Sequence, residues 1–192
     1  YAVKSVTIVE IMGRDAGWIA LNAAIAGGAD VCIIPEIPYD IDKVKEKIES
    51  RYKKGRGFCI IVVAEGSKNA NGEQVGMESQ IPGDRHFKLG GIGEALKFEL
   101  QQAGIEHDIR VSVLGHLQRG GTPIAYDRVL ASEFGVKAFE LAMKGEFGKM
   151  VAYKHPDIIA VTFEEALREP HLVSPDSFLV HTAKGLNIAF GD

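Results

Sequence analysis

The sequence of 192 residues contains only two cysteines and no hydrophobic run as long as a membrane-spanning helix. Its longest apolar runs, Val31–Ile34 and Cys59–Ala64, have the length of buried strands, whereas a membrane span needs roughly 20 residues. Cys32 and Cys59 lie in these runs, which predicts buried thiols in a reducing compartment. This pattern argues against a disulfide framework, a cysteine metal cluster and a membrane protein.

The sequence also has no excess of basic residues. Its 22 Lys and Arg stand against 26 Asp and Glu, for a formal net charge of −4 and an isoelectric point near 5.9. Proteins that bind nucleic acid or anionic membranes non-specifically carry a basic surface, and this composition indicates none. With 46 % hydrophobic and 25 % charged residues, we expect an ordinary folded domain without extensive disorder.

Strand-like and helix-like segments alternate along the chain. Strands are predicted at Val6–Ile11, Val31–Ile34, Phe58–Ala64 and Arg110–Leu114, and helices at Ala16–Ala26, Asp42–Lys53, Ile92–Gln102 and Asp127–Lys144. The last helix is expected to bury Val129, Leu130, Phe134, Ala138, Leu141 and Ala142. Less regular stretches are a loop or insertion at 66–88 and a tail with a strand at Val151–Tyr153 and a short helix at Phe163–Arg168. The alternation predicts an α/β fold, a mostly parallel sheet with helices on both faces.

In such a fold, ligands bind beyond the carboxyl ends of the strands. Three polar groups follow predicted strands here: Met12-Gly13-Arg14, Glu65 and the turn Gly115–Pro123. In that turn, His116, Gln118 and Arg119 supply hydrogen-bond donors, and an arginine can grip a phosphate with two parallel hydrogen bonds. A solvated turn whose arginine caps a helix is an equally good interpretation from physics alone.

The other candidates each have a plain alternative. Gly13-Arg14-Asp15 offers an anion site at a strand-to-helix junction, or only a surface ion pair. Glu65 is placed to accept hydrogen bonds from sugar hydroxyls, or is an ordinary strand-end charge. Arg110 would bind a phosphate or a neighbouring acid, and Lys53–Arg56 is a polyphosphate effector site or a solvated helix end.

Several motifs are missing or incomplete. Gly91-Ile92-Gly93 lacks the third glycine of a dinucleotide loop and follows no strong strand, so an oxidoreductase built on it is disfavoured. The sequence contains no phosphate-binding GxxxxGK[ST] loop, no GxSxG elbow and no convincing metal-ligand spacing. The residues thus indicate a site for a phosphorylated small molecule, without a visible general base.

Three blocks, taken in order, resemble the 6-phosphofructokinase family. They are VEIMGRDAGWIA at Val9–Ala20, VVAEGS at Val62–Ser67 and VLGHLQRGGTPIAYDRVLAS at Val113–Ser132. The resemblance extends from about Lys4 to about Lys144 and is weaker at 66–108 and after Gly145. It implies a cytoplasmic phosphotransferase of glycolysis that acts on fructose 6-phosphate with Mg²⁺ and either ATP or pyrophosphate.

The resemblance also implies roles for individual residues. Met12, Gly13 and Arg14 would hold fructose 6-phosphate, with Arg14 also stabilising the transferring phosphoryl group. Glu65 would bind sugar hydroxyls, while His116 and Arg119, together with Gln118 of the same motif, would complete the phosphate site. Arg110 would reach the site of a neighbouring subunit, which implies a homo-oligomer, either dimer or tetramer.

The resemblance leaves regulation and the subunit contacts open. Asp30, Lys54 and Arg56 match positions that bind nucleotide effectors in bacterial members of the family. A second intersubunit arginine of the family is replaced by Ser5, so either Lys4 substitutes for it or the cationic clamp is weaker.

The chain begins at Tyr1 without an initiator methionine or a signal peptide, so we expect a piece of a longer protein. We expect it to be the C-terminal, sugar-phosphate half of the enzyme, inactive by itself, because the family's nucleotide-binding segment and catalytic aspartate lie upstream of the Met-Gly-Arg turn. Within it, 1–114 would bind the sugar phosphate, 115–145 would pack on the nucleotide half, and 146–192 would form a C-terminal segment. The alternative is a sugar-phosphate sensor that never had a catalytic half.

Overall fold

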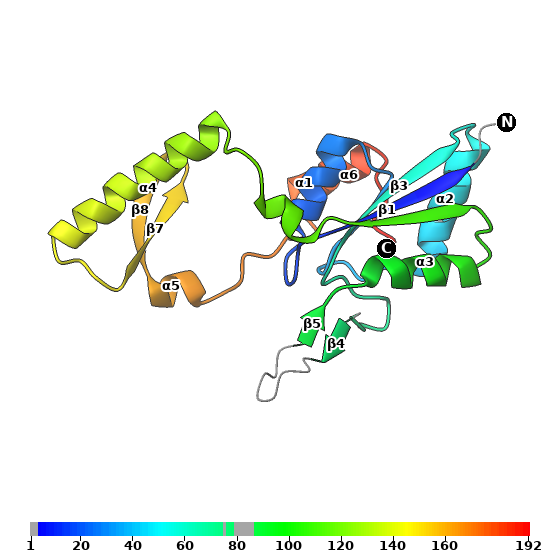
Figure 1. Cartoon of the computed structure of the whole chain (residues 1–192), viewed down its shortest axis with the longest axis horizontal. Helices are drawn as coiled ribbons and strands as arrows, with labels where there is room; N and C mark the ends of the chain where they lie inside the picture. The colour runs from blue at the N-terminus through cyan, green and yellow to red at the C-terminus, as the bar shows by residue number, and fades with distance from the viewer. Residues whose placement is uncertain (1–3, 75, 79–86) are drawn as a thin grey trace. The chain divides into compact units, whose positions relative to one another are not determined.

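The computed structural model describes residues 4–74, 76–78 and 87–192. The chain divides into two compact units (Figure 1). Unit 1 comprises the chain up to Arg119 together with Leu172–Asp192, and unit 2 comprises Gly120–His171. The boundaries expected from the sequence, after residues 114 and 145, remain a prediction about how the chain divides by role.

Unit 1 is built on a four-stranded parallel sheet with the order β2-β3-β1-β6. The strands are β1 (Ser5–Ile11), β2 (Val31–Ile33), β3 (Phe58–Ala64) and β6 (Asp108–Val113), and the helices are α1 (Trp18–Gly27), α2 (Ile41–Lys53), α3 (Ile92–Gln102) and α6 (Phe178–Gly185). A small antiparallel pair, β4 (Gly76–Glu78) and β5 (Phe87–Leu89), begins in the stretch 66–88 that was predicted as a loop or insertion and ends one residue beyond it; 75 and 79–86 lie outside the described residues.

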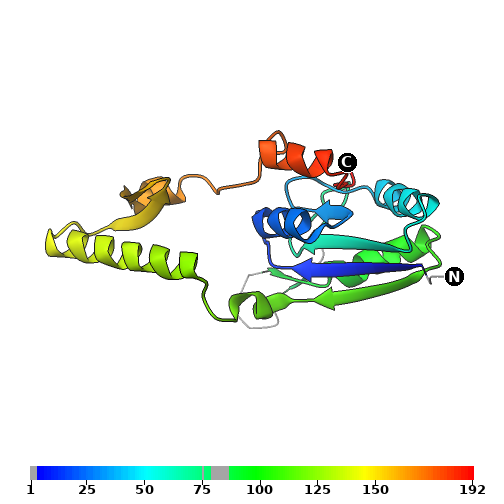
Figure 2. The same cartoon turned by 90° about the horizontal axis from the view of Figure 1, so that it is seen from above.

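Helices cover both faces of this sheet, as the alternating pattern predicted. One hydrophobic cluster joins Val6 and Ile8 of β1 to α2 and α3, and a second joins Ile11 to α1 and α6. Figure 2 shows the strands of this sheet side by side, and in Figure 1 α1 and α6 lie on the opposite side of the strands from α3. The predicted α/β fold is therefore confirmed.

The helix boundaries follow from local contacts. Helix α2 is capped by Asp40, whose carboxylate accepts a hydrogen bond from the Asp42 amide at 2.8 Å, and it buries Val44 and Ile48 as predicted. Helix α1 begins at Trp18 and not at Ala16, and the residue before it, Gly17, makes no side-chain cap.

Unit 2 consists of the long helix α4 (Ala125–Met143), the antiparallel pair β7 (Lys149–Lys154) and β8 (Asp157–Thr162), and the short helix α5 (Phe163–Leu167). The position of α4 matches the prediction, but its buried side does not. Leu141 is buried, whereas Val129 is 58 % exposed and Ala138 and Ala142 are exposed. The apolar residues of α4 are not confined to one side of the helix, and within the described residues little covers them.

The C-terminal tail is more regular than the sequence predicted. The sequence predicted neither strand β8 nor helix α6, yet Val180 and Ala183 of α6 are buried in the core of unit 1. Cys32 and Cys59 are free and buried, as predicted. Within the described residues, no helix has both the length and the apolarity needed to cross a membrane.

Candidate functional site at the carboxyl edge of the sheet

The three predicted polar groups follow neighbouring strands. Strand β1 lies between β3 and β6, and their register pairs Ile11 with Ala64 and Glu10 with Val113. The loop with Met12, Gly13 and Arg14, the residue Glu65, and the turn η1 (Gly115–Arg119) with His116, Gln118 and Arg119 therefore leave the sheet at the same edge. The sequence prediction that these groups share one edge agrees with the strand order.

Backbone hydrogen bonds tie the three groups together. The Glu65 amide donates to the Ile11 carbonyl at 2.9 Å, and the Gly66 amide donates to the Gly13 carbonyl at 2.9 Å. On the other side, the Leu114 amide donates to the Glu10 carbonyl at 3.0 Å, just before η1. The loop after β1 is thus held between the exits of β3 and β6.

Two glycines make this close approach possible. A Cβ at Gly66 would lie 1.8 Å from the Arg14 carbonyl oxygen, so a side chain there cannot coexist with the observed loop. A Cβ at Gly13 would lie 3.0 Å from the Ala16 carbonyl oxygen, and its φ of +154° is a conformation that favours glycine. The loop holding Arg14 therefore lies directly against the start of the segment after Glu65.

The side chains at this edge are cationic and accessible. Arg14, His116 and Arg119 are exposed, and Glu65 and Met12 are half-buried. The amide nitrogen of Gln118 donates to the Gly115 carbonyl at 3.1 Å, so Gln118 braces its own turn. Exposed guanidinium and imidazole groups, at an edge that also carries a half-buried carboxylate, are of the chemical types that can bind a phosphorylated, hydroxyl-bearing ligand.

Arg110 lies elsewhere. It pairs with Thr7 in the middle of the sheet and forms a 2.8 Å ion pair with Asp108 on the exposed strand β6. Of the two interpretations of Arg110, the structure of this chain shows the pairing with a neighbouring acid.

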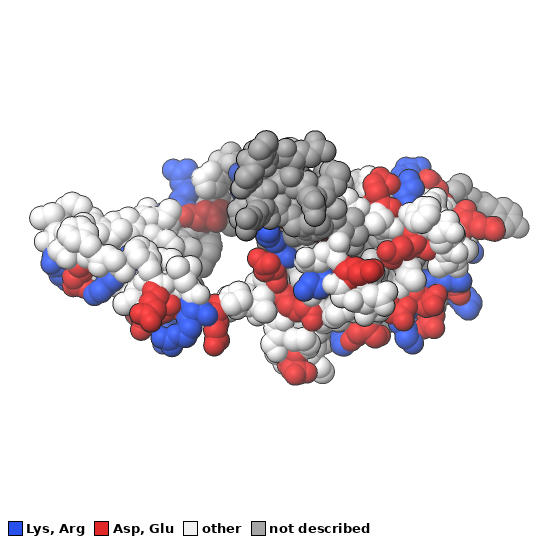
Figure 3. Space-filling view, turned by 90° about the horizontal axis from the view of Figure 1, so that it is seen from below, with Lys and Arg blue, Asp and Glu red and all other residues white. Residues whose placement is uncertain are grey.

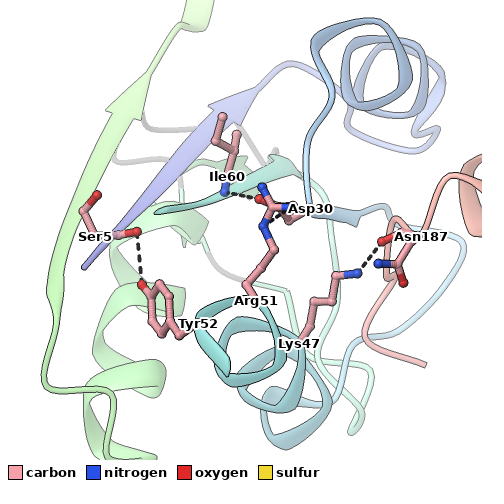
Figure 4. A network of polar contacts seen from close by, with 7 residues as sticks. All are labelled: Ser5, Asp30, Lys47, Arg51, Tyr52, Ile60 and Asn187. Atoms are coloured by element: carbon pink, nitrogen blue, oxygen red, sulfur yellow. Dashed lines mark hydrogen bonds and ion pairs between the residues drawn. The ribbon is translucent and has the colours of Figure 1, made fainter. Parts of the chain in front are cut away.

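The three possible effector residues lie at the opposite, amino edge of the sheet. Asp30 is buried and precedes β2, and its carboxylate accepts from the Ile60 amide at 2.9 Å and lies 2.7 Å from Arg51 Nε (Figure 4). Lys54 and Arg56, which precede β3, are exposed. The Asp30 carboxylate is thus engaged inside the protein, while the two cations face solvent.

Ser5 stands where the resemblance places the second intersubunit arginine, and both Ser5 and its neighbour Lys4 contact Tyr52. The Ser5 carbonyl accepts a hydrogen bond from the Tyr52 hydroxyl at 3.1 Å (Figure 4), and the Lys4 ammonium lies 5.1 Å from the centre of the Tyr52 ring. Lys4 is exposed, so its charge remains at the surface.

Two buried or half-buried carboxylates near the site were not predicted. Glu10 is 3 % exposed and accepts from the Gly91 and Gly93 amides at 3.1 and 2.9 Å, at the N-terminus of α3. Its carboxylate therefore accepts from amides at the start of α3, where the helix dipole favours a negative charge. A charged residue inside the apolar run Val6–Ile11 was the signal that could have identified it.

Glu36 is the second of these carboxylates. Both of its oxygens accept from the Gly17 amide, at 3.0 and 3.1 Å, and one also accepts from the Val173 amide at 2.8 Å. No sequence signal pointed to it. Among the described residues, no group of three or more His, Cys, Asp or Glu side chains is arranged to hold a metal ion.

Comparison with known proteins gives the family. The model of the phosphofructokinase family matches residues 1–142. The chain is 45 % identical over 187 residues to ATP-dependent 6-phosphofructokinase 2 of Clostridium perfringens, covering 97 % of this chain and 51 % of that protein. It is 46 % identical over 188 residues to ATP-dependent 6-phosphofructokinase 1 of a Synechocystis strain, with 97 % and 51 % covered.

A solved structure agrees with this. Phosphofructokinase of Pichia pastoris in the T-state superposes with a TM-score of 0.70 at 27 % identity, covering 97 % of this chain and 19 % of that one. The chain spans about half the length of the two bacterial relatives. Because the family model matches residues 1–142, most of the chain, we conclude that the chain belongs to the phosphofructokinase family.

Proposed function

We propose that this chain is the sugar-phosphate portion of a 6-phosphofructokinase, and that the whole protein phosphorylates the 1-hydroxyl of fructose 6-phosphate to give fructose 1,6-bisphosphate. The observation that carries the proposal is the register of β3, β1 and β6, which brings Arg14, Glu65 and His116–Arg119 to one edge of the sheet. The names of the relatives at 45 and 46 % identity favour ATP over pyrophosphate as the donor.

In this proposal, His116 and Arg119 bind the 6-phosphate, and Glu65 accepts hydrogen bonds from sugar hydroxyls. Arg14, held by its loop against Gly66, neutralises charge on the phosphoryl group as it transfers. Phosphoryl transfer depends mainly on positioning and electrostatic stabilisation, which fixed cations supply. Mg²⁺ and the nucleotide would be bound mainly by residues outside this chain, which is the C-terminal half of the enzyme in this proposal.

The exposed apolar side chains of α4 support the proposal that unit 2 packs against another part of the protein. Its large apolar side chains are exposed: Tyr126 by 57 %, Val136 by 62 %, Phe139 by 66 % and Met143 by 72 %. Much of the left-hand part of Figure 3, where unit 2 lies, is uncharged. Exposed apolar surface of this extent marks an interface, and we propose that 115–145 packs on the nucleotide-binding half.

Oligomer formation is a further part of the proposal. Arg110 is 76 % exposed in its side chain and lies away from the site of its own chain, which suits a residue that serves the site of a neighbouring subunit. Its contact with Asp108 is an exposed ion pair of small energy, so Arg110 can exchange it for a phosphate.

Calorimetric titration of the chain with fructose 6-phosphate tests the proposal, with inorganic phosphate and fructose as controls. We expect the sugar phosphate to bind more tightly than either control. If all three bind equally, or none binds even when the upstream half is supplied, the site assignment is wrong. The chain alone should show no kinase activity with ATP and Mg²⁺, and activity without an upstream half would contradict the division proposed here.

A further inference from the structure

We propose that Glu36 is a positioning residue for the loop that holds Met12, Gly13 and Arg14. This inference rests on the proposed function only in what the loop binds. That Glu36 orders the loop is a separate statement, which the experiment below tests by itself.

Hydrogen bonds hold this loop at both of its ends. Its amino end continues β1 and is fixed by backbone hydrogen bonds to Glu65 and Gly66. Its carboxyl end enters α1 through Gly17, which has no side chain to cap the helix. Glu36 supplies this cap from the segment after β2, through hydrogen bonds of 3.0 and 3.1 Å to the Gly17 amide.

Gly17, at the end of the loop, packs closely against residues that follow β2. A Cβ at Gly17 would lie 2.4 Å from Ile34 Cβ and 3.0 Å from a Glu36 carboxylate oxygen. The end of the loop is therefore pressed against the exit of β2, and Glu36 is the side chain that holds it there. A negative carboxylate beside the first amides of a helix is also favoured by the helix dipole.

Glu36 also contacts the segment in which the chain returns to unit 1. Val173 is 1 % exposed and lies near the start of the segment that re-enters unit 1. Its amide donates at 2.8 Å to Glu36 Oε1, the oxygen that also accepts from the Gly17 amide at 3.0 Å. One carboxylate therefore fixes both the loop with Arg14 and the point where the chain returns to unit 1. Loss of Glu36 should loosen these two segments together.

Amide hydrogen exchange measured by NMR tests the ordering role. In Glu36→Ala, the amides of Gly17 and Val173 should exchange at least about tenfold faster, the loss expected for two charge-assisted hydrogen bonds, while amides of α3 keep their rates. Glu36→Gln keeps one acceptor oxygen and should restore part of the protection, and it replaces the alanine variant if that variant does not fold. Glu99→Gln is the control, because Glu99 is also half-buried and bonds the Tyr39 hydroxyl instead.

Titration with fructose 6-phosphate then tests positioning. Glu36→Ala should weaken binding at least about tenfold, because a displaced loop misplaces Arg14, and Glu99→Gln should not. Wild-type exchange rates at Gly17 and Val173 in the Glu36 variants would overturn the inference. So would faster exchange with unchanged affinity. If the wild-type chain does not bind the sugar phosphate at all, the proposed function fails, and the exchange rates alone decide whether Glu36 orders the loop.

Discussion

The carbonyl oxygen of Arg14 occupies the space where a side chain at Gly66 would begin, 1.8 Å from the position of its Cβ. Two loops that follow different strands are in contact here without a side chain between them. This contact fixes the backbone of Arg14 relative to the segment after Glu65.

We therefore expect Gly66→Ala to displace the loop and to destabilise the fold by about 1–3 kcal/mol, as overpacking typically does. Urea denaturation measures the stability, and titration with fructose 6-phosphate should show weaker binding. Gly27→Ala is the matched control, since nothing lies within 4 Å of a Cβ there. A Gly66→Ala variant as stable as Gly27→Ala would show that the loop shifts at no cost.

Arg119→Ala should weaken the binding of fructose 6-phosphate by about 2–5 kcal/mol, because a bound phosphate would lose its charged partner. Calorimetry of the variant measures this directly. Lys54→Ala, which removes an exposed cation at the opposite edge of the sheet, should leave binding unchanged. Normal binding by Arg119→Ala would contradict the assignment of the phosphate site.

Glu10→Gln should lower the free energy of unfolding by about 1.5–3 kcal/mol, the range for hydrogen bonds to a charged group. The amide of glutamine would turn a donor toward the Gly91 or Gly93 amide, which also donates. Glu106→Gln, at an exposed position, is the control. Equal stability of the two variants in urea would show that the Glu10 contacts contribute nothing.

Asp30→Asn should destabilise the chain by about 2–4 kcal/mol, since it leaves the half-buried Arg51 guanidinium without its carboxylate. Lys54→Ala and Arg56→Ala should be neutral to stability, because both cations are exposed. Thermal unfolding of the three variants checks this. If Asp30→Asn is also neutral to stability, the contacts of Asp30 drawn in Figure 4 do not stabilise the fold.

Cys32 and Cys59 should resist thiol reagents at pH 8 and react only after unfolding in guanidinium, because burial raises the pKa of each thiol to about 12. An unfolded thiol has a pKa of about 8.5 and ionises first. The unfolded state therefore gains stability as pH rises above about 8.5, so the fold should weaken from there toward pH 12. Rapid labelling of the folded chain at pH 8 would contradict this.

The strands and helices of unit 1 were predictable because their hydrophobic residues recur with the spacing of a strand or a helix. Phe58–Ala64 and Ile92–Gln102 were predicted with the bounds that the structure shows. The buried side predicted for α4 was wrong, because apolar residues lie all round this helix and, within the described residues, little covers them. Helical spacing alone therefore does not say which apolar residues another part of the chain covers.

The candidate site was predictable only in part. Arg14, Glu65 and Arg119 follow strands, so the topology of a parallel sheet gathers them. Glu36 was not predictable, because its partners Gly17 and Val173 are 19 and 137 residues away in sequence. Contacts of that separation depend on the whole fold and leave no local pattern.

Unit 1 is assembled from two separate stretches of chain, so a cut between these stretches does not divide its core. The final stretch, Leu172–Asp192, supplies buried Val180, Ile188 and Phe190, and Ala189 bridges to Val31 at the edge of the sheet. A protease that cuts only within Gly120–His171 would therefore yield two peptides that stay associated. They would co-elute under native conditions and separate only in denaturant, as complementing fragments do.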